Sequence, residues 1–115
     1  MVKTFKRGDI VLVPIVFSDL SGVKLRPALI IEADSFVSSF ADCLVATITS
    51  NTSRISSASI LLTSDSGGKT GLAQDSVILL DRITNVPRFS IKRSLGHLED
   101  LTQVDRILKL IFGLS

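Results

Sequence analysis

The sequence lacks the residues on which several kinds of protein chemistry depend. Its 115 residues include one cysteine (Cys43), one histidine (His97), and no tryptophan or tyrosine. A single cysteine excludes an internal disulfide framework and a zinc site built from cysteines. A single histidine likewise excludes a two-histidine acid–base pair or a multi-histidine metal centre within one chain. We therefore expect no metal site and no cofactor, and any chemistry must come from hydroxyls, carboxylates, arginine and lysine.

Length and hydropathy predict one soluble domain over residues 1–115. The hydrophobic fraction of 45% is far too high for a disordered chain. Residues 10–17 are apolar and follow three cations, which imitates a signal peptide, but Asp9 and Pro14 argue against one. The stretch is also far shorter than the roughly 20 residues that span a bilayer. Together with the unpaired Cys43, these features predict a cytoplasmic protein with no membrane partner.

The net charge of +2 is small, but the cations are unevenly placed. Residues 82–98 carry four cations and no acid; the cations are Arg82, Arg88, Lys92 and Arg93. Such a cluster fits an anionic partner such as RNA, because neutralising phosphates releases counterions. Judged on charge alone, a solvated basic surface without any ligand is the alternative, and it stays open.

Short apolar runs separated by polar turns predict a chain made mostly of strands. The expected strands are residues 10–17, 27–31, 43–48, 56–63 and 76–83, with a loop at residues 18–24. Pro14 lies inside the first strand, which indicates an edge position or a bulge. The continuous run at residues 27–31 is typical of a strand buried on both faces.

The C-terminal segment changes to the spacing of a helix. Apolar residues recur every three or four positions from Leu101 to Phe112, which predicts one amphipathic helix. Thr102 is a candidate N-cap, and Gly113 stands where a helix would end. Several strands with one terminal helix and no βαβ alternation predict a mainly β fold, a small and partly open antiparallel barrel with a helix packed against it.

Several segments in a fixed order carry a family resemblance. They are R-G-D-I-V at residues 7–11, L-R-P-A-L-I at 25–30, A-T-I-T-S-N at 46–51, D-S-V-I-L-L-D-R-I-T at 75–84, and L-G-H-L at 95–98. Over nearly its whole length the chain resembles the PemK/MazF family of bacterial toxin endoribonucleases. The stretch at residues 17–27, with its R-P dipeptide, resembles the PemK-like branch.

The resemblance implies an SH3-like barrel with a C-terminal helix and a homodimer. The residues also favour a homodimer, because a small barrel with an apolar-faced helix and a mean hydropathy of +0.45 has more hydrophobic surface than one core hides. It implies cleavage of single-stranded RNA without a metal, and neutralisation by a cognate antitoxin protein. The family's catalytic arginine matches Arg26, and its catalytic threonine matches Thr49. A guanidinium can hold two phosphoryl oxygens as charge develops during attack by a ribose 2′-OH, and a threonine hydroxyl can donate a hydrogen bond to the same group.

A wider set of polar residues is expected to bind RNA around these two. The set is Ser18, Ser21, Lys24, Ser50, Asn51, Arg54, Arg82 and Arg88. Arginine is a poor general base near neutrality, so we assign Arg26 to transition-state stabilisation and to proton donation to the leaving 5′-oxygen.

One segment departs from the family pattern. Many relatives carry Gln-Ile-Arg-Thr after the long strand, whereas this chain has Arg-Ile-Thr-Asn at residues 82–85. The target sequence of a relative therefore does not transfer. The alternative function is a non-catalytic binding protein on the same barrel, either a gyrase-poisoning type of toxin or an RNA-binding homologue that has lost cleavage.

Overall fold

The computed structural model of the protein describes residues 5–16, 22–36, 41–64 and 69–115. Within these ranges the chain forms six strands, two 3₁₀ turns and one α-helix. Their bounds are β1 (Asp9–Val16), β2 (Val23–Ile30), β3 (Asp42–Thr49), η1 (Thr52–Arg54), β4 (Ser59–Leu62), β5 (Ser76–Pro87), η2 (Arg88–Ser90), β6 (Arg93–His97) and α1 (Thr102–Phe112).

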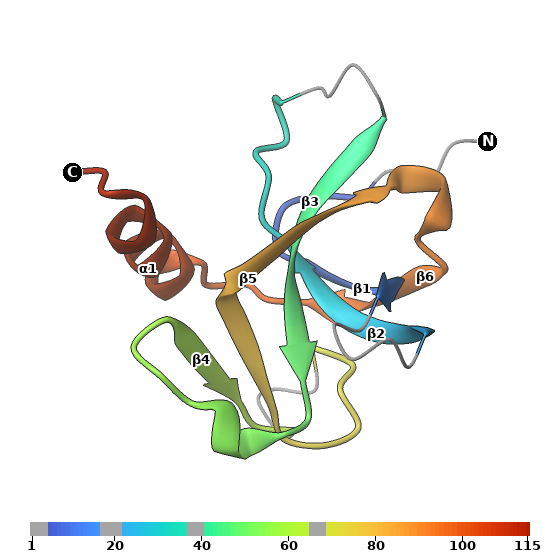
Figure 1. Ribbon diagram of the computed structural model, residues 1–115, viewed down its shortest axis with the longest axis horizontal. Coiled ribbons are helices and arrows are strands. Elements are labelled where there is room, and N and C mark those ends of the chain that lie inside the picture. Colours follow the sequence, from blue (N-terminus) through green and yellow to red (C-terminus); the bar gives the residue numbers. More distant parts are fainter. Residues whose placement is uncertain (1–4, 17–21, 37–40, 65–68) are drawn as a thin grey trace.

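All six strands belong to one antiparallel sheet, in the order β4-β5-β3-β2-β1-β6. The sheet curls into a half-barrel, and α1 packs beside β4 and β5 (Figure 1). The predicted mainly β barrel with a C-terminal helix is confirmed. In the part of the chain that the structure describes, no helix has the length and apolarity to cross a membrane.

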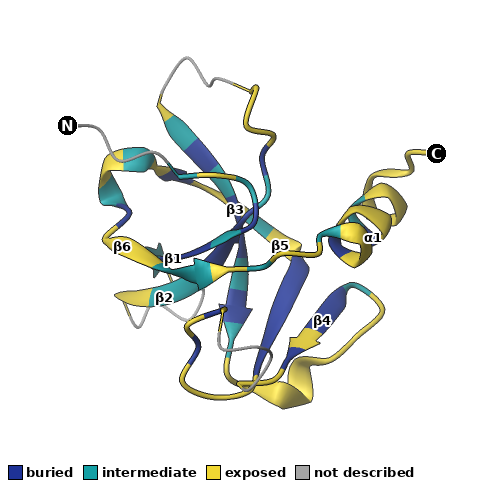
Figure 2. Ribbon diagram, turned by 180° about the vertical axis from the view of Figure 1, so that it is seen from behind, coloured by how far each residue is buried: buried dark blue, intermediate teal, exposed yellow. Residues whose placement is uncertain are grey.

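Both faces of the sheet are buried at its centre, so the molecule has two apolar clusters. Successive strand residues point to opposite faces. Leu29 therefore joins the cluster that α1 covers, while its neighbours Ala28 and Ile30 join the cluster inside the curl. Figure 2 shows the buried residues of β3 and of the first half of β5, in contrast to the largely exposed surface of α1. The run predicted to be buried on both faces is confirmed.

Strand boundaries differ from those expected. β2 begins at Val23 rather than at residue 27, because it forms a long antiparallel ladder with β1 that ends in the pair Val16 and Val23. β5 continues to Pro87, and the short strand β6 was not predicted. β6 pairs with β1 over Asp9 to Leu12 only, so Pro14 lies beyond that pairing, in agreement with the predicted edge position.

Helix α1 starts differently from the prediction and ends as predicted. Leu101 holds the N-cap position without a side-chain cap. Asp100 instead accepts a hydrogen bond from the Thr102 backbone N–H at 3.0 Å. Hydrogen bonds from the backbone and the side chain of Thr102 lower the pKa of the Asp100 carboxyl. Thr102 is therefore not the N-cap. Gly113 closes the helix with a φ of 68°, a left-handed conformation that glycine adopts without strain.

Arg7 fastens α1 to the sheet. Its Nε donates to the carbonyl of Ile31 at 2.8 Å, and its terminal nitrogen lies 2.7 Å from the Asp105 carboxylate on the helix. Its backbone N–H also donates to Asp34 at 2.7 Å. One arginine thus connects the start of β1, the end of β2 and the first turns of α1.

Candidate active site

Arg26 and Thr49 lie on neighbouring strands. The pairing of β2 with β3 sets Ala28 opposite Thr47, with Leu29 and Ile30 following in the same register (Figure 1). The ladder ends at the pair of Ala28 and Thr47, two residues short of Arg26 and Thr49; because side chains alternate along a strand, Arg26 lies on the face of Ala28 and Thr49 on the face of Thr47. Opposed residues of an antiparallel pair point to the same face, with Cβ atoms about 5 Å apart. The two residues that the family resemblance singled out therefore share one face at one end of the sheet.

The backbone at Arg26 is fixed by its neighbours. Pro27 follows, and the residue before a proline is restricted to extended conformations. Arg26 is paired with Val13 of β1 and its side chain is half-buried, at the end of the face that carries Ala28 and Ile30. Lys24 stands two residues earlier on the same face and is exposed. This face presents two cations beside a buried apolar cluster.

The Thr49 hydroxyl is oriented by the turn that follows it. It accepts a hydrogen bond from the Asn51 backbone N–H at 3.1 Å. Asn51 in turn caps η1, accepting from the Ser53 backbone N–H at 3.1 Å and from the Ser53 hydroxyl at 2.6 Å. A hydroxyl that accepts one hydrogen bond keeps its own proton for donation. Thr49 is thus a positioned donor at the end of β3.

Three other predicted RNA-binding residues extend this end of the sheet. Ser50, Asn51 and Arg54 follow Thr49 directly and are exposed. Arg82 is exposed on β5, within three extra residues that bulge out between the pairs Ala46–Ile83 and Thr47–Leu79. Its carbonyl accepts a 3.4 Å hydrogen bond from Thr47. Ser18 and Ser21 lie outside the described residues.

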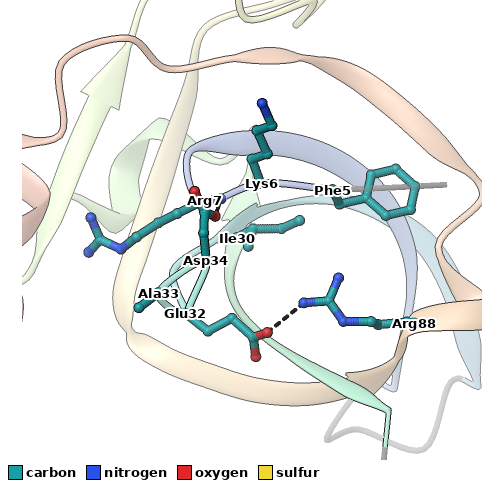
Figure 3. Close-up of a pocket in the computed structure, with 8 residues that line it drawn as sticks. All are labelled: Phe5, Lys6, Arg7, Ile30, Glu32, Ala33, Asp34 and Arg88. Atoms are coloured by element: carbon teal, nitrogen blue, oxygen red, sulfur yellow. Dashed lines mark hydrogen bonds and ion pairs between the residues drawn. The ribbon is translucent and has the colours of Figure 1, made fainter. Parts of the chain in front are cut away.

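Arg88 is not brought to this end of the sheet. Its guanidinium forms a 2.6 Å ion pair with Glu32, whose side chain is only 3% exposed (Figure 3). Glu32 follows β2 six positions beyond Arg26, about 20 Å away at ordinary strand rise. The second carboxylate oxygen accepts from the Leu44 backbone N–H at 3.0 Å. Arg88 therefore neutralises a buried acid at the opposite mouth of the barrel, beside a cavity of about 140 Å³.

Burial is the main cause of the state of Cys43, which lies near this pair. Burial, with the nearby Glu32 carboxylate as a lesser cause and against the opposing effect of Arg88, raises the pKa of this thiol to about 11. The thiol is fully buried and protonated near neutrality, so it packs as a small apolar side chain.

His97 makes a structural contact. Its Nδ1 lies 3.0 Å from the Asp9 carboxylate, which also accepts from the Lys6 backbone N–H at 2.9 Å. This ties the end of β6 to the start of β1. Across the described ranges, no three side chains of the His, Cys, Asp and Glu types gather as a metal site would require.

Sequence reasoning missed an apolar groove beside α1. The groove measures about 760 Å³. It is lined by α1, the C-terminal tail, and the outer faces of β3 and β5; the apolar lining residues are Ile31, Leu44, Ile83, Leu108, Ile111, Phe112 and Leu114. Phe112 is 59% and Leu114 is 65% exposed. The apolar-faced helix and the mean hydropathy of +0.45 indicated more hydrophobic surface than one small core hides, but not where on the fold it would form a groove.

Comparison with known proteins gives one consistent result. Residues 6–112 match the family described as "PemK-like, MazF-like toxin of type II toxin-antitoxin system". A curated relative, "Probable endoribonuclease MazF" of Mycolicibacterium smegmatis, is 31% identical over 94 residues, which cover 80% of this chain and 84% of the relative.

Solved structures show the same fold. The Mycobacterium tuberculosis toxin MazF-mt6 is 22% identical with a TM-score of 0.73, covering 93% of this chain and 98% of that one. An endoribonuclease in complex with its cognate antitoxin, from a mycobacterial species, is 17% identical with a TM-score of 0.74, covering 97% and 98%. A MazE-MazF structure from Deinococcus radiodurans is 18% identical with a TM-score of 0.74, covering 100% and 99%.

Proposed function

The chain belongs to the PemK-like, MazF-like family of type II toxins, and on that premise we propose that it is an endoribonuclease that cuts single-stranded RNA without a metal. The observation that carries the proposal is the shared face of Arg26 and Thr49. A pure binding protein has no need of a half-buried guanidinium next to an oriented hydroxyl at a strand end.

The chemistry follows from those two side chains. A ribose 2′-oxygen attacks the adjacent phosphorus and gives its proton to solvent water, while the bond from phosphorus to the 5′-oxygen breaks. The 5′-oxygen takes a proton from Arg26 and leaves as a 5′-hydroxyl, and Arg26 is reprotonated from solvent. The products are a 2′,3′-cyclic phosphate and a 5′-OH. Arg26 stabilises the negative charge that develops on the phosphoryl oxygens and donates a proton to the leaving oxygen. Thr49 donates a hydrogen bond to the same phosphoryl group.

The polar residues around this pair bind the RNA strand. Lys24 stands next to Arg26 on β2, and Ser50, Asn51 and Arg54 continue the face beyond Thr49. Arg82 lies beside Thr47 on the bulge of β5. Each exposed cation that neutralises a phosphate adds to affinity and to its dependence on salt. Arg88 is left out of this set, because its guanidinium is already paired with Glu32.

The partners of the toxin follow from the family. Similar structures include an endoribonuclease in complex with its cognate antitoxin and a MazE-MazF pair. We assign this chain an antitoxin partner of its own, and a cytoplasmic location, where its RNA substrate is found.

The groove beside α1 supports a homodimer. Phe112 and Leu114 expose large apolar surfaces next to Leu44 and Ile83, and a second copy would cover them. Phe112→Asp tests this assignment, because the side chain is exposed in one protomer and its replacement leaves the core intact. Wild type should sediment as a dimer and the variant as a monomer. A wild-type monomer at micromolar concentration would contradict it.

The nuclease proposal is tested with purified protein, single-stranded RNA and EDTA. Cutting should persist under chelation and leave a 2′,3′-cyclic or 3′-phosphate and a 5′-OH. Arg26→Ala should lower the rate by about 10²- to 10³-fold, the usual loss when one donor to a developing oxyanion is removed. Arg106→Ala removes an exposed arginine on α1 and serves as the matched control. Loss of cutting in EDTA, or equal rates for the two variants, would refute the mechanism.

The same variants separate the nuclease from a binding toxin. Expression of the wild type should arrest growth, and Arg26→Ala should abolish the arrest. Arrest that survives the substitution would favour a non-catalytic target such as gyrase.

A further inference from the structure

Phe89 is the most exposed large hydrophobic residue in the described ranges, at 90%. It stands on η2, a turn that is anchored on both sides. Arg88 before it is paired with the buried Glu32, and Ile91 after it is 7% exposed within the cluster inside the curl. The Ser90 hydroxyl also donates to the Pro87 carbonyl at 2.6 Å. The ring is thus held outward on a rigid platform.

The surroundings of Phe89 are basic. No acid occurs anywhere in residues 82–98. Lys92 and Arg93 follow the turn and are both exposed, while the charge of Arg88 is offset by Glu32. An aromatic face next to two exposed cations is the pattern that binds single-stranded nucleic acid, because bases stack on the ring and phosphates pair with the cations.

The start of β6, which follows this platform, is connected through β1 to the strand that carries Arg26. The Lys92 backbone N–H donates to the Leu12 carbonyl at 2.9 Å, and Arg93 is paired with Leu12 on β1. Leu12 is itself paired with Pro27 on β2, the residue after Arg26. Two strand spacings, about 10 Å, therefore separate the start of β6 from the strand that carries Arg26. Phe89 stands beyond the start of β6, next to Arg88 at the mouth of the barrel that lies about 20 Å from Arg26. An RNA strand bound at Arg26 spans that distance with several nucleotides.

We propose that η2 and the start of β6 form a second RNA contact, in which Phe89 stacks on a base several nucleotides from the cleavage site while Lys92 and Arg93 bind neighbouring phosphates. The inference rests on the proposed function for its substrate, but not on cleavage. A ring followed by two exposed cations in a segment without acids favours RNA over a protein partner, since the phosphates of RNA are anionic and lysine is depleted at protein interfaces.

The test measures the affinity for a 20-nucleotide single strand of 2′-O-methyl RNA, which lacks the attacking hydroxyl and stays intact. Phe89→Ala should weaken binding by roughly 5- to 100-fold, the usual loss of one stacked base. Phe89→Trp should keep or strengthen it. Phe36→Ala is the matched control, since Phe36 lies outside the basic segment and is 53% exposed. The RNA affinity of this variant should stay within about twofold of that of the wild type. Lys92→Gln should reduce the slope of log affinity against log salt by about 0.7.

The outcomes separate this inference from the nuclease proposal. Equal affinities for Phe89→Ala and Phe36→Ala overturn the second contact, even if the wild type cuts RNA. Unchanged RNA affinity with weaker dimerisation or antitoxin binding also overturns it, because the ring then faces a protein. If the wild type binds RNA through Phe89 but does not cut it, the second RNA contact is supported and the nuclease proposal is refuted.

Discussion

The ion pair between Arg88 and Glu32 makes a specific prediction about stability. Removing one partner of a buried pair costs about 3–5 kcal/mol, since the remaining charge stays buried without compensation. Here the Glu32 side chain is 3% exposed but Arg88 is 37% exposed, so water screens part of the interaction. We expect Arg88→Met to lower the free energy of unfolding by about 2–3 kcal/mol and the melting temperature by roughly 10 °C.

Urea denaturation measures this loss against a matched control. Arg82→Met removes an exposed cation from β5, the strand that precedes η2, and should change the free energy of unfolding by less than about 0.5 kcal/mol. Adding Glu32→Gln to Arg88→Met should recover about half of the loss, because the neutral side chain keeps the hydrogen bond from Leu44 without a buried charge. Equal losses for Arg88→Met and Arg82→Met would refute the assignment of Arg88 to a structural role.

Three further predictions follow from local contacts. Asn51→Ala should cost about 1 kcal/mol through loss of the η1 cap. It should slow RNA cleavage by a larger factor, because Thr49 loses the turn that orients it; parallel kinetics and unfolding check this. For Cys43, the folded pKa lies above the unfolded value, so its contribution to stability is lost as pH rises from about 9 through 11. Cys43→Ala should remove this fall in the free energy of unfolding over the same pH range, as alkaline unfolding curves would show. Gly96→Ala should unfold the chain or cost more than about 2 kcal/mol, because the new Cβ would lie 2.2 Å from the backbone oxygen of Lys69; thermal unfolding measures this.

The sequence predicts the fold well where local pattern and burial agree. The apolar run at residues 27–31 and the helix ending at Gly113 are both found as expected, since each depends on spacing within a short segment. The start of β2 and the strand β6 were not predicted, because their pairing depends on β1, which is distant in sequence from β6 and separated from β2 by a loop.

The candidate site likewise contains residues that short motifs predict and residues whose contacts depend on the whole fold. Family motifs point to Arg26 and Thr49 as candidates, and the alternation of side chains from the last β2–β3 pair puts both on one face. Arg88 was expected to bind RNA because its segment contains no acid. Its partner, Glu32, lies 56 residues earlier in the chain, and only the fold brings the two together.

The central claim is that Arg26 and Thr49 act on one phosphate, and a double-mutant cycle tests it most directly. Single-turnover cleavage of RNA in EDTA would be measured for wild type, Arg26→Ala, Thr49→Ala and the double variant. Each single variant should be slower, and the double variant should lose much less than the product of the two losses, because both donors stabilise the same charge. Losses that multiply, or an Arg26→Ala variant that cuts at the wild-type rate, would contradict the claim.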